Sequence, residues 1–146
     1  MQPTPADWPR LSSALFYEDP SAAIAWLERA FGFETRLRVD DADGGVIHSE
    51  LTYGGAVVMV AGLVRDDQPN GRASPRQVDG LNTQSLFLYV DDVDAHCERA
   101  RAAGGKVLSE PRTTDYGEGY WVDRGYEVAD LEGHRWWFAQ RMRDRS

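Results

Sequence analysis

The most suggestive pair of chemically active side chains is His48 and Glu50, in the stretch VIHSELTY. Residues two apart on a β-strand point to the same face, so the imidazole and the carboxylate can meet. Such a pair suits a general base, a cation-binding site or part of an unusual metal site, for which no third ligand is evident. It equally suits a hydrogen-bonded, partly exposed contact on an open sheet, and the sequence leaves these interpretations open.

A second group lies in residues 113–122 (TTDYGEGYWV), where Tyr116, Tyr120 and Trp121 stand among glycines. We expect a loop over Glu110 to Gly119. Glycines allow a segment to move, and aromatic side chains give it a surface with which to close over a ligand. The same composition fits a loop that covers a sheet edge or forms a dimer contact.

The remaining histidines and the single cysteine are expected to be structural. His134 follows the glycine of a predicted turn and belongs in the core or the turn. His96 lies on a predicted helix and is expected to be exposed. Its neighbour Cys97 falls on the apolar stripe of that helix, so we expect a buried, unreactive thiol. One cysteine excludes an internal disulfide.

The elements that position these residues follow one pattern in the first half of the chain. A strand is followed by Asp19-Pro20, in which Asp is a helix N-cap and Pro occupies the first helical position. Apolar residues then recur at helical spacing until Gly32, which ends the helix. Three further strands complete a βαβββ unit, with the strands expected at residues 11–17, 35–39, 46–53 and 56–61.

The second half repeats this order. Shifting the first half by 73 residues places Ser12 on Ser85, Leu15 on Leu88, Asp19 on Asp92 and Gly32 on Gly105. Strands are expected at residues 85–90, 106–109, 126–129 and 134–139, with a tight turn at 130–133. The sequence therefore predicts a duplicated module, about 10–61 and about 84–141, joined by a connection at 62–83. This connection is interpreted as a simple tether, or as a mobile segment with a functional role.

The length and net charge of the chain limit the number of domains and the classes of partner that we expect. A chain of 146 residues fits one domain. A net charge of −8 argues against a nucleic-acid partner, because binding phosphates takes clustered Lys and Arg. No apolar run approaches the roughly 20 residues of a membrane span. No signal peptide opens the chain, so we expect a cytoplasmic protein that binds no membrane.

Four short motifs carry a resemblance: AFGFE after the first helix, VDDVDAH before the second, AAGGKV after it, and D-x-x-GHRWWFA at the last strand. This ordered set, over about residues 11–140, resembles the vicinal oxygen chelate superfamily of glyoxalases, bleomycin-resistance proteins and extradiol dioxygenases. The resemblance implies an α+β fold in which two βαβββ modules form a curled, cup-like mixed sheet with helices outside. It also implies a ligand on the concave face, and a homodimer.

Enzymes of that superfamily hold a divalent ion with His, Gln or Glu from the first and last strands of each module. The resemblance transfers these positions to Ser12, Met59, Ser85 and Trp137. Hydroxyl, thioether and indole groups are poor ligands for such an ion, so we expect no metal and no cofactor. The same side chains suit an organic ligand, since they combine a flat apolar surface with hydrogen-bonding groups. They could also simply fill the cup.

Three functions remain. The favoured one is a metal-free protein that sequesters a small aromatic or cationic molecule, as bleomycin-resistance proteins do. The alternatives are a metal-dependent lyase or dioxygenase of the glyoxalase type and a non-catalytic dimeric scaffold with a filled cup. No catalytic residue is assigned. The predicted ligand-binding residues are Ser12, His48, Glu50, Met59, Ser85, Tyr116, Tyr120, Trp121 and Trp137.

Overall fold

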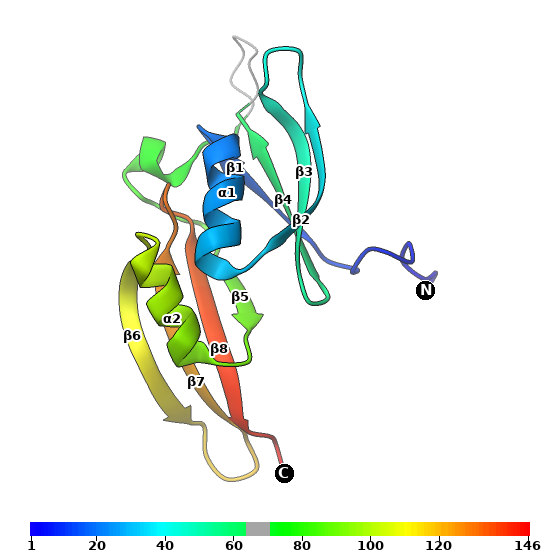
Figure 1. The fold of residues 1–146 in the computed structure, drawn as a ribbon. Coiled ribbons are helices and arrows are strands. Elements are labelled where there is room, and N and C mark those ends of the chain that lie inside the picture. The colour runs from blue at the N-terminus through cyan, green and yellow to red at the C-terminus, as the bar shows by residue number, and fades with distance from the viewer. Residues whose placement is uncertain (64–70) are drawn as a thin grey trace.

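The computed structural model describes residues 1–63 and 71–146 and shows two βαβββ modules, one above the other in Figure 1. The predicted duplication and α+β class are confirmed. Residues 64–70, part of the connection interpreted as a mobile segment or simple tether, lie outside the described residues. The first module comprises β1 (Ser13–Tyr17), α1 (Pro20–Phe31), β2 (Glu34–Asp40), β3 (Val46–Tyr53) and β4 (Ala56–Gly62). The second comprises β5 (Leu86–Tyr89), α2 (Val93–Ala102), β6 (Lys106–Asp115), β7 (Val122–Ala129) and β8 (Arg135–Arg143), and a 3₁₀ helix, η1 (Pro75–Val78), precedes it.

The strands of each module form one four-stranded mixed sheet, in the orders β1-β4-β3-β2 and β5-β8-β7-β6. The first strand of each module runs parallel to the last, and the other pairs are antiparallel. One helix lies over one face of each sheet (Figure 1). β1 and β5 are therefore edge strands. Within the described residues no helix is long and apolar enough to cross a membrane.

The helix boundaries follow from their caps. The side chains of Asp19 and Asp92 each accept a hydrogen bond of 3.0 Å from the backbone N–H three residues later, which satisfies a donor left free at a helix start. Gly32 ends α1 with a φ of +83°. After α2 the left-handed residue is Gly104, at +94°, rather than Gly105. Gly105 is instead required by close packing, because a Cβ there would lie 2.9 Å from a helix carbonyl.

A single core joins the two modules, because α1 packs on α2 as well as on its own sheet. Phe31, at the end of α1, places its ring 5.3 Å from Trp136 and 4.7 Å from Phe138 on β8. All three side chains are fully buried. The apolar stripes predicted for the two helices are buried in this core, and they include Cys97, whose thiol pKa is raised by burial.

The prediction that His96 is exposed is wrong, because α1 covers this face of α2. The side chain is only 8% exposed. Its Nε2 lies 2.9 Å from the carbonyl oxygen of Phe31, and its Nδ1 lies 2.7 Å from the Tyr126 hydroxyl. Burial lowers the pKa of His96 and favours the neutral ring. Nε2–H then donates to the carbonyl, and Nδ1 accepts from the tyrosine.

The last three strands of the second module are longer than predicted, whereas β5 is shorter than the expected 85–90. β6 runs to Asp115 instead of ending at Ser109, so the loop shrinks to residues 116–121. Pro111 lies inside β6, where it is tolerated because β6 is an edge strand and the register shifts between Ser109 and Arg112. β7 begins at Val122, and β8 continues to Arg143.

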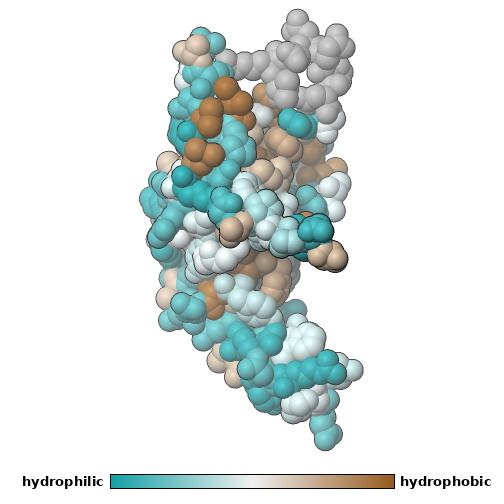
Figure 2. All heavy atoms as spheres, turned by 90° about the vertical axis from the view of Figure 1, so that its right-hand side faces the viewer, coloured by the Kyte–Doolittle hydropathy of each residue, from teal (hydrophilic) through white to brown (hydrophobic). Residues whose placement is uncertain are grey.

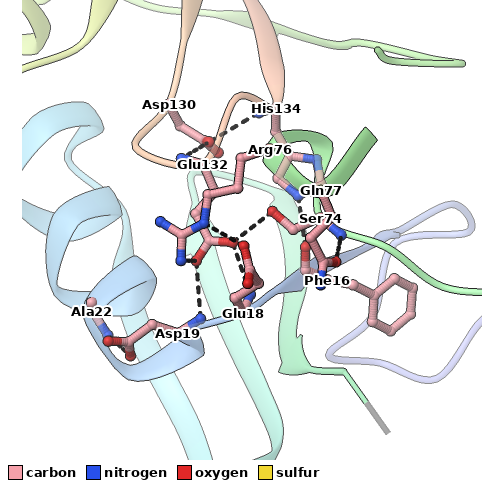
Figure 3. A network of polar contacts seen from close by, with 10 residues as sticks. All are labelled: Phe16, Glu18, Asp19, Ala22, Ser74, Arg76, Gln77, Asp130, Glu132 and His134. Atoms are coloured by element: carbon pink, nitrogen blue, oxygen red, sulfur yellow. Dashed lines mark hydrogen bonds and ion pairs between the residues drawn. The ribbon is translucent and has the colours of Figure 1, made fainter. Parts of the chain in front are cut away.

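The turn between β7 and β8 ties the two modules together through Glu132 (Figure 3). This side chain is 1% exposed. Its carboxylate accepts hydrogen bonds from the backbone N–H groups of Glu18 and Asp19, at 2.8 and 3.0 Å, just before α1. It also accepts a 2.6 Å bond from the Ser74 hydroxyl in the connection. The described part of the connection is therefore docked on the second module by Ser74 and on the first by the ion pair between Arg76 and Glu18.

Asp130 organises the same turn from inside. Its Oδ1 accepts from the backbone N–H groups of Glu132 and His134. Its Oδ2 accepts a 2.6 Å bond from the Tyr17 hydroxyl on β1 and a 3.1 Å bond from the Trp136 indole. His134, predicted to be a core or turn residue, donates from Nε2 to the carbonyl of Phe16 at 2.9 Å. The second module thus holds the end of β1 by two hydrogen bonds, one with Asp130 and one with His134.

Replacing Glu132 by Ala should destabilise the fold severely. The change leaves two backbone N–H groups and one hydroxyl without acceptors, and each such buried group costs about 1–3 kcal/mol. Thermal melting by circular dichroism measures the effect. The matched control is Glu110→Ala, which removes an exposed carboxylate paired with Arg101 and should change stability by less than about 1 kcal/mol. Equal melting temperatures for the two variants would contradict the assigned role of Glu132.

Candidate functional site

A cavity of about 400 Å³ lies between β1 and β5, an edge strand from each of the two sheets. We call it the seam cavity. Ser12 and Ser85, which the sequence placed at equivalent positions of the two modules, both line it together with Phe87. The Ser12 hydroxyl is buried and, within the described residues, has no hydrogen-bond partner. A larger cavity of about 650 Å³ near the start of α1 contains none of the predicted site residues.

Met59 and Trp137 lie one strand further from the seam. Met59 pairs with Ala14 of β1, and Trp137 pairs with Phe87 of β5. Trp137 alternates with two fully buried residues that face the helices, so it points to the opposite face of its sheet, as predicted. Neither residue lines the seam cavity. The two serines thus line the same cavity. Met59 and Trp137 lie on the neighbouring strands, on the sheet faces turned away from the helices.

His48 and Glu50 meet as predicted, on the sheet face opposite α1. Glu50 Oε1 lies 3.1 Å from His48 Nε2, and Glu50 Oε2 accepts a 2.6 Å hydrogen bond from Arg36 Nε. The hydrogen bond with His48, followed by that from Arg36, lowers the pKa of the buried Glu50 carboxyl. The ring of Trp8 lies 4.8 Å from the Arg36 guanidinium. This polar cluster therefore has its charge compensated within the first module.

Apolar side chains beside this cluster are exposed. Leu37 pairs with Glu50 and Val39 with His48, so both lie on the same face as the cluster. They are 43% and 42% exposed. In Figure 2, hydrophobic surface gathers over the upper and middle part of the molecule, while its lower end is hydrophilic or neutral. Such surface on the first module is available to a ligand or to another protein chain.

The aromatic residues of the predicted lid lie in the turn between β6 and β7, near the C-terminal end of the molecule (Figure 1). Tyr116 and Tyr120 are each 53% exposed. Their rings lie 5.5 and 6.1 Å from that of Trp121. None of the three lines the seam cavity. Trp121 instead faces the guanidinium of Arg141 on β8, at 5.4 Å.

Sequence reasoning missed a second set of residues on the outer face of the second sheet. Phe87 and Tyr89 are 57% and 48% exposed, with ring centroids 5.2 Å apart. Asp123 on β7 pairs with Arg141 on β8 at 2.6 Å, and the Tyr89 hydroxyl donates to the same carboxylate. The alternation in SLFLYV could have revealed Phe87 and Tyr89, because their neighbours Leu86 and Leu88 face the core side.

The residues at the superfamily's metal positions do not fit a divalent ion. Two serine hydroxyls, a thioether and an indole lack the imidazole and carboxylate groups that such ions select. Within the part of the chain that the structure describes, no three His, Cys, Asp or Glu side chains are grouped as metal ligands would be. His48 and Glu50 supply two side chains of such a group, which needs a third ligand.

Comparisons with known proteins place the chain in a family. A model described as Glyoxalase/Bleomycin resistance protein/Dioxygenase superfamily matches residues 11–138. An uncharacterized protein of Mycobacterium tuberculosis (strain H37Rv) is 34% identical over 93% of this chain and 76% of its own. TioX from Micromonospora sp. ML1 is 32% identical, with a TM-score of 0.68 over 90% of this chain and 95% of its own. The fosfomycin resistance protein FosX from Listeria monocytogenes shares the fold at 15% identity, with a TM-score of 0.62 over 90% of this chain and 92% of its own. The chain therefore belongs to the glyoxalase/bleomycin resistance protein/dioxygenase superfamily.

Proposed function

We propose that this chain is a metal-free binding protein that sequesters a small aromatic or cationic molecule. The observation that carries the proposal is the seam cavity, which Ser12 and Ser85 both line beside the exposed ring of Phe87. Among the residues that the structure describes, the buried Ser12 hydroxyl has no hydrogen-bond partner. A buried hydroxyl without a partner costs about 1–3 kcal/mol, and a polar group of a ligand would recover that energy. Apolar walls with a few polar groups are typical of small-molecule sites.

The ligand's ring stacks on Trp137, which pairs with the seam residue Phe87 on the outer face of the second sheet. A ligand long enough to reach the turn before β7 also contacts Tyr120 or Trp121. Ser12 and Ser85 fix its polar groups from the seam, and Met59 adapts to its shape. His48 and Glu50 do not line the seam cavity, and they supply a polar contact to a ligand that also extends over the outer face of the first sheet. The acidic net charge of −8 favours a cationic over an anionic ligand.

Relatives support a small-molecule ligand. Among solved structures of the same fold, one is named a fosfomycin resistance protein and another a glyoxalase/bleomycin resistance protein from Streptomyces sp. CB03234. These names concern those proteins, which are 15% and 18% identical to this chain. They motivate a panel of aromatic and cationic antibiotics as the first ligands to test.

Trp137→Ala should abolish binding of any panel member that quenches tryptophan fluorescence in the wild type. The variant loses the flat surface on which the ligand stacks. It should remain folded, because Trp137 is only partly buried and faces away from the core. Trp137→Phe is the matched variant and should keep most of the affinity, since it preserves an aromatic face. Unchanged affinity in Trp137→Ala would remove this residue from the site.

We also propose that the chain forms a homodimer, in which the exposed Leu37 and Val39 are partly covered. Dimers are common in this superfamily. Sedimentation equilibrium at micromolar concentration should give the mass of two chains, and Leu37→Glu should shift the equilibrium toward the mass of one. A wild type that sediments as a single chain over the whole concentration range would contradict this proposal.

The His48–Glu50 contact supports a second candidate, a metal-dependent lyase or dioxygenase of the glyoxalase type. One related fold, a mutant of the Listeria monocytogenes FosX protein, was solved in complex with Mn(II) and a dihydroxypropylphosphonic acid. In this chain the metal would need His48, Glu50 and a ligand from elsewhere. The third possibility, a scaffold with a filled cup, predicts no ligand at all.

Thermal melting with Ni(II), Zn(II), Mn(II) and Fe(II) separates the first two candidates. A ligand present at a hundred times its Kd stabilises the native state by about 2.7 kcal/mol, which a melt resolves. We expect no such shift, because the donor set does not fit these ions. Stoichiometric binding of one metal with a raised melting temperature, lost in His48→Ala, would favour the enzyme instead.

A further inference from the structure

Arg141 occupies the centre of a cluster on the outer face of the second sheet. Its Nε donates a 2.6 Å hydrogen bond to Asp123 Oδ1. Its guanidinium carbon lies 5.1 Å from the ring centroid of Tyr89 and 5.4 Å from that of Trp121. It also donates to the Tyr89 hydroxyl. A planar cation is thus held by a carboxylate, a phenol and two aromatic rings, the groups that recognise organic cations.

The groups around this cation are anchored independently of it. Asp123 lies on β7 and is 8% exposed. Tyr89 lies on β5, and its hydroxyl donates to Asp123 Oδ2 at 3.0 Å. Trp121 lies in the turn before β7, with its ring against that of Tyr116. Three separate elements supply these side chains, and the Tyr89–Asp123 and Trp121–Tyr116 contacts do not involve Arg141.

Arg141 reaches the cluster on a long side chain, which also pairs with the exposed Asp144 at 3.3 Å. Arg141 lies near the end of β8, where the residues that follow it are exposed, and its own side chain is 33% exposed. An arginine side chain has several rotatable bonds and can move its head group into water. The Asp123 carboxylate, which is 8% exposed, loses its cationic partner when the Arg141 head group moves away, and a ligand cation in the same place would restore the pair.

We propose that Tyr89, Trp121 and Asp123 form a cage for a guanidinium, amidinium or ammonium group of the ligand, and that Arg141 fills this cage when no ligand is bound. The inference rests on the proposed binding function and assigns the cationic part of the ligand to one place. The ligand cation displaces the Arg141 head group, and the aromatic part extends toward Trp137, which lies earlier on β8.

Displacement has a measurable consequence. When a site is open for only a fraction of the time, the apparent affinity falls by that fraction. Removing Arg141 should therefore strengthen binding of a cation, whereas a neutral ligand of the same shape gains nothing. This result distinguishes a cage from an ordinary ion pair, for which loss of the arginine would only destabilise the protein.

Benzamidine and benzamide provide the test, because they have the same shape and differ in charge. Their dissociation constants are measured by tryptophan fluorescence for the wild type and for Arg141→Gln, Asp123→Asn and Arg124→Gln. Arg124 is the matched control, because it lies next to Asp123 on the same strand but pairs with Asp94 of α2. Circular dichroism melts establish that each variant is folded.

The proposal predicts that Arg141→Gln binds benzamidine at least about tenfold more tightly than the wild type does. Asp123→Asn should lose benzamidine binding, Arg124→Gln should match the wild type, and none of the changes should affect benzamide. Benzamidine should also raise the melting temperature of Arg141→Gln more than that of the wild type. In the wild type, benzamidine but not benzamide should shift the Arg141 Nε–H resonance. This measurement uses only the wild-type protein, so it tests the proposal even if Arg141→Gln does not fold.

Equal or weaker benzamidine binding by Arg141→Gln, or an Arg141 resonance that stays in place, would overturn the cage. If the cage is overturned but antibiotics of the panel still bind through Trp137, the proposed function holds without the cage. If benzamidine follows the predictions while no panel compound depends on Trp137, the cage stands and the proposed stacking site falls.

Discussion

The buried carboxylate of Glu132 is the contact on which the rest of the arrangement depends. A carboxylate at this depth is stable only when its oxygens accept hydrogen bonds, and here the donors come from two other parts of the chain. Two are the backbone N–H groups before α1, and the third is the Ser74 hydroxyl. The turn that ends the second module thereby fixes the start of the first helix and the end of the connection together (Figure 3).

The position of the seam cavity follows from this contact. Asp130, in the same turn, holds Tyr17 at the end of β1, and His134 holds the carbonyl of Phe16. β1 is therefore fixed relative to β8, and β5 pairs with β8. These constraints bring the two edge strands together, so that Ser12 and Ser85 share one cavity. The outer faces of both sheets stay open, with aromatic and charged side chains on the second.

Local patterns predicted the elements well. Asp19 and Asp92 start helices because a carboxylate satisfies free N–H groups, a property that one residue carries alone. Alternation placed Glu50 with His48 for a similarly local reason, whereas the position of Trp137 came from the resemblance to the superfamily. The predictions failed where packing between distant parts decides. The burial of His96 depends on α1, the length of β6 depends on its place at the sheet edge, and Glu132 looks like an ordinary turn residue in the sequence. The cluster around Arg141 was missed because it combines β5, β7, β8 and a turn, and no spacing along the chain reveals that combination.

The five tryptophans offer the most direct measurement of where a ligand binds, because their indole N–H resonances report from different regions. Trp137 lies on β8, Trp121 lies in the turn before β7, and Trp8 precedes β1 with its ring beside Arg36 of β2. Trp26 and Trp136 are buried, with their indoles hydrogen-bonded to the Ala103 carbonyl and to Asp130. In a nuclear magnetic resonance titration with proflavine, a planar aromatic cation, the account predicts shifts of Trp121 and Trp137 while Trp26 and Trp136 stay in place. Shifts confined to Trp8, or no shift of any indole at saturating proflavine, would contradict a ligand site on the second sheet.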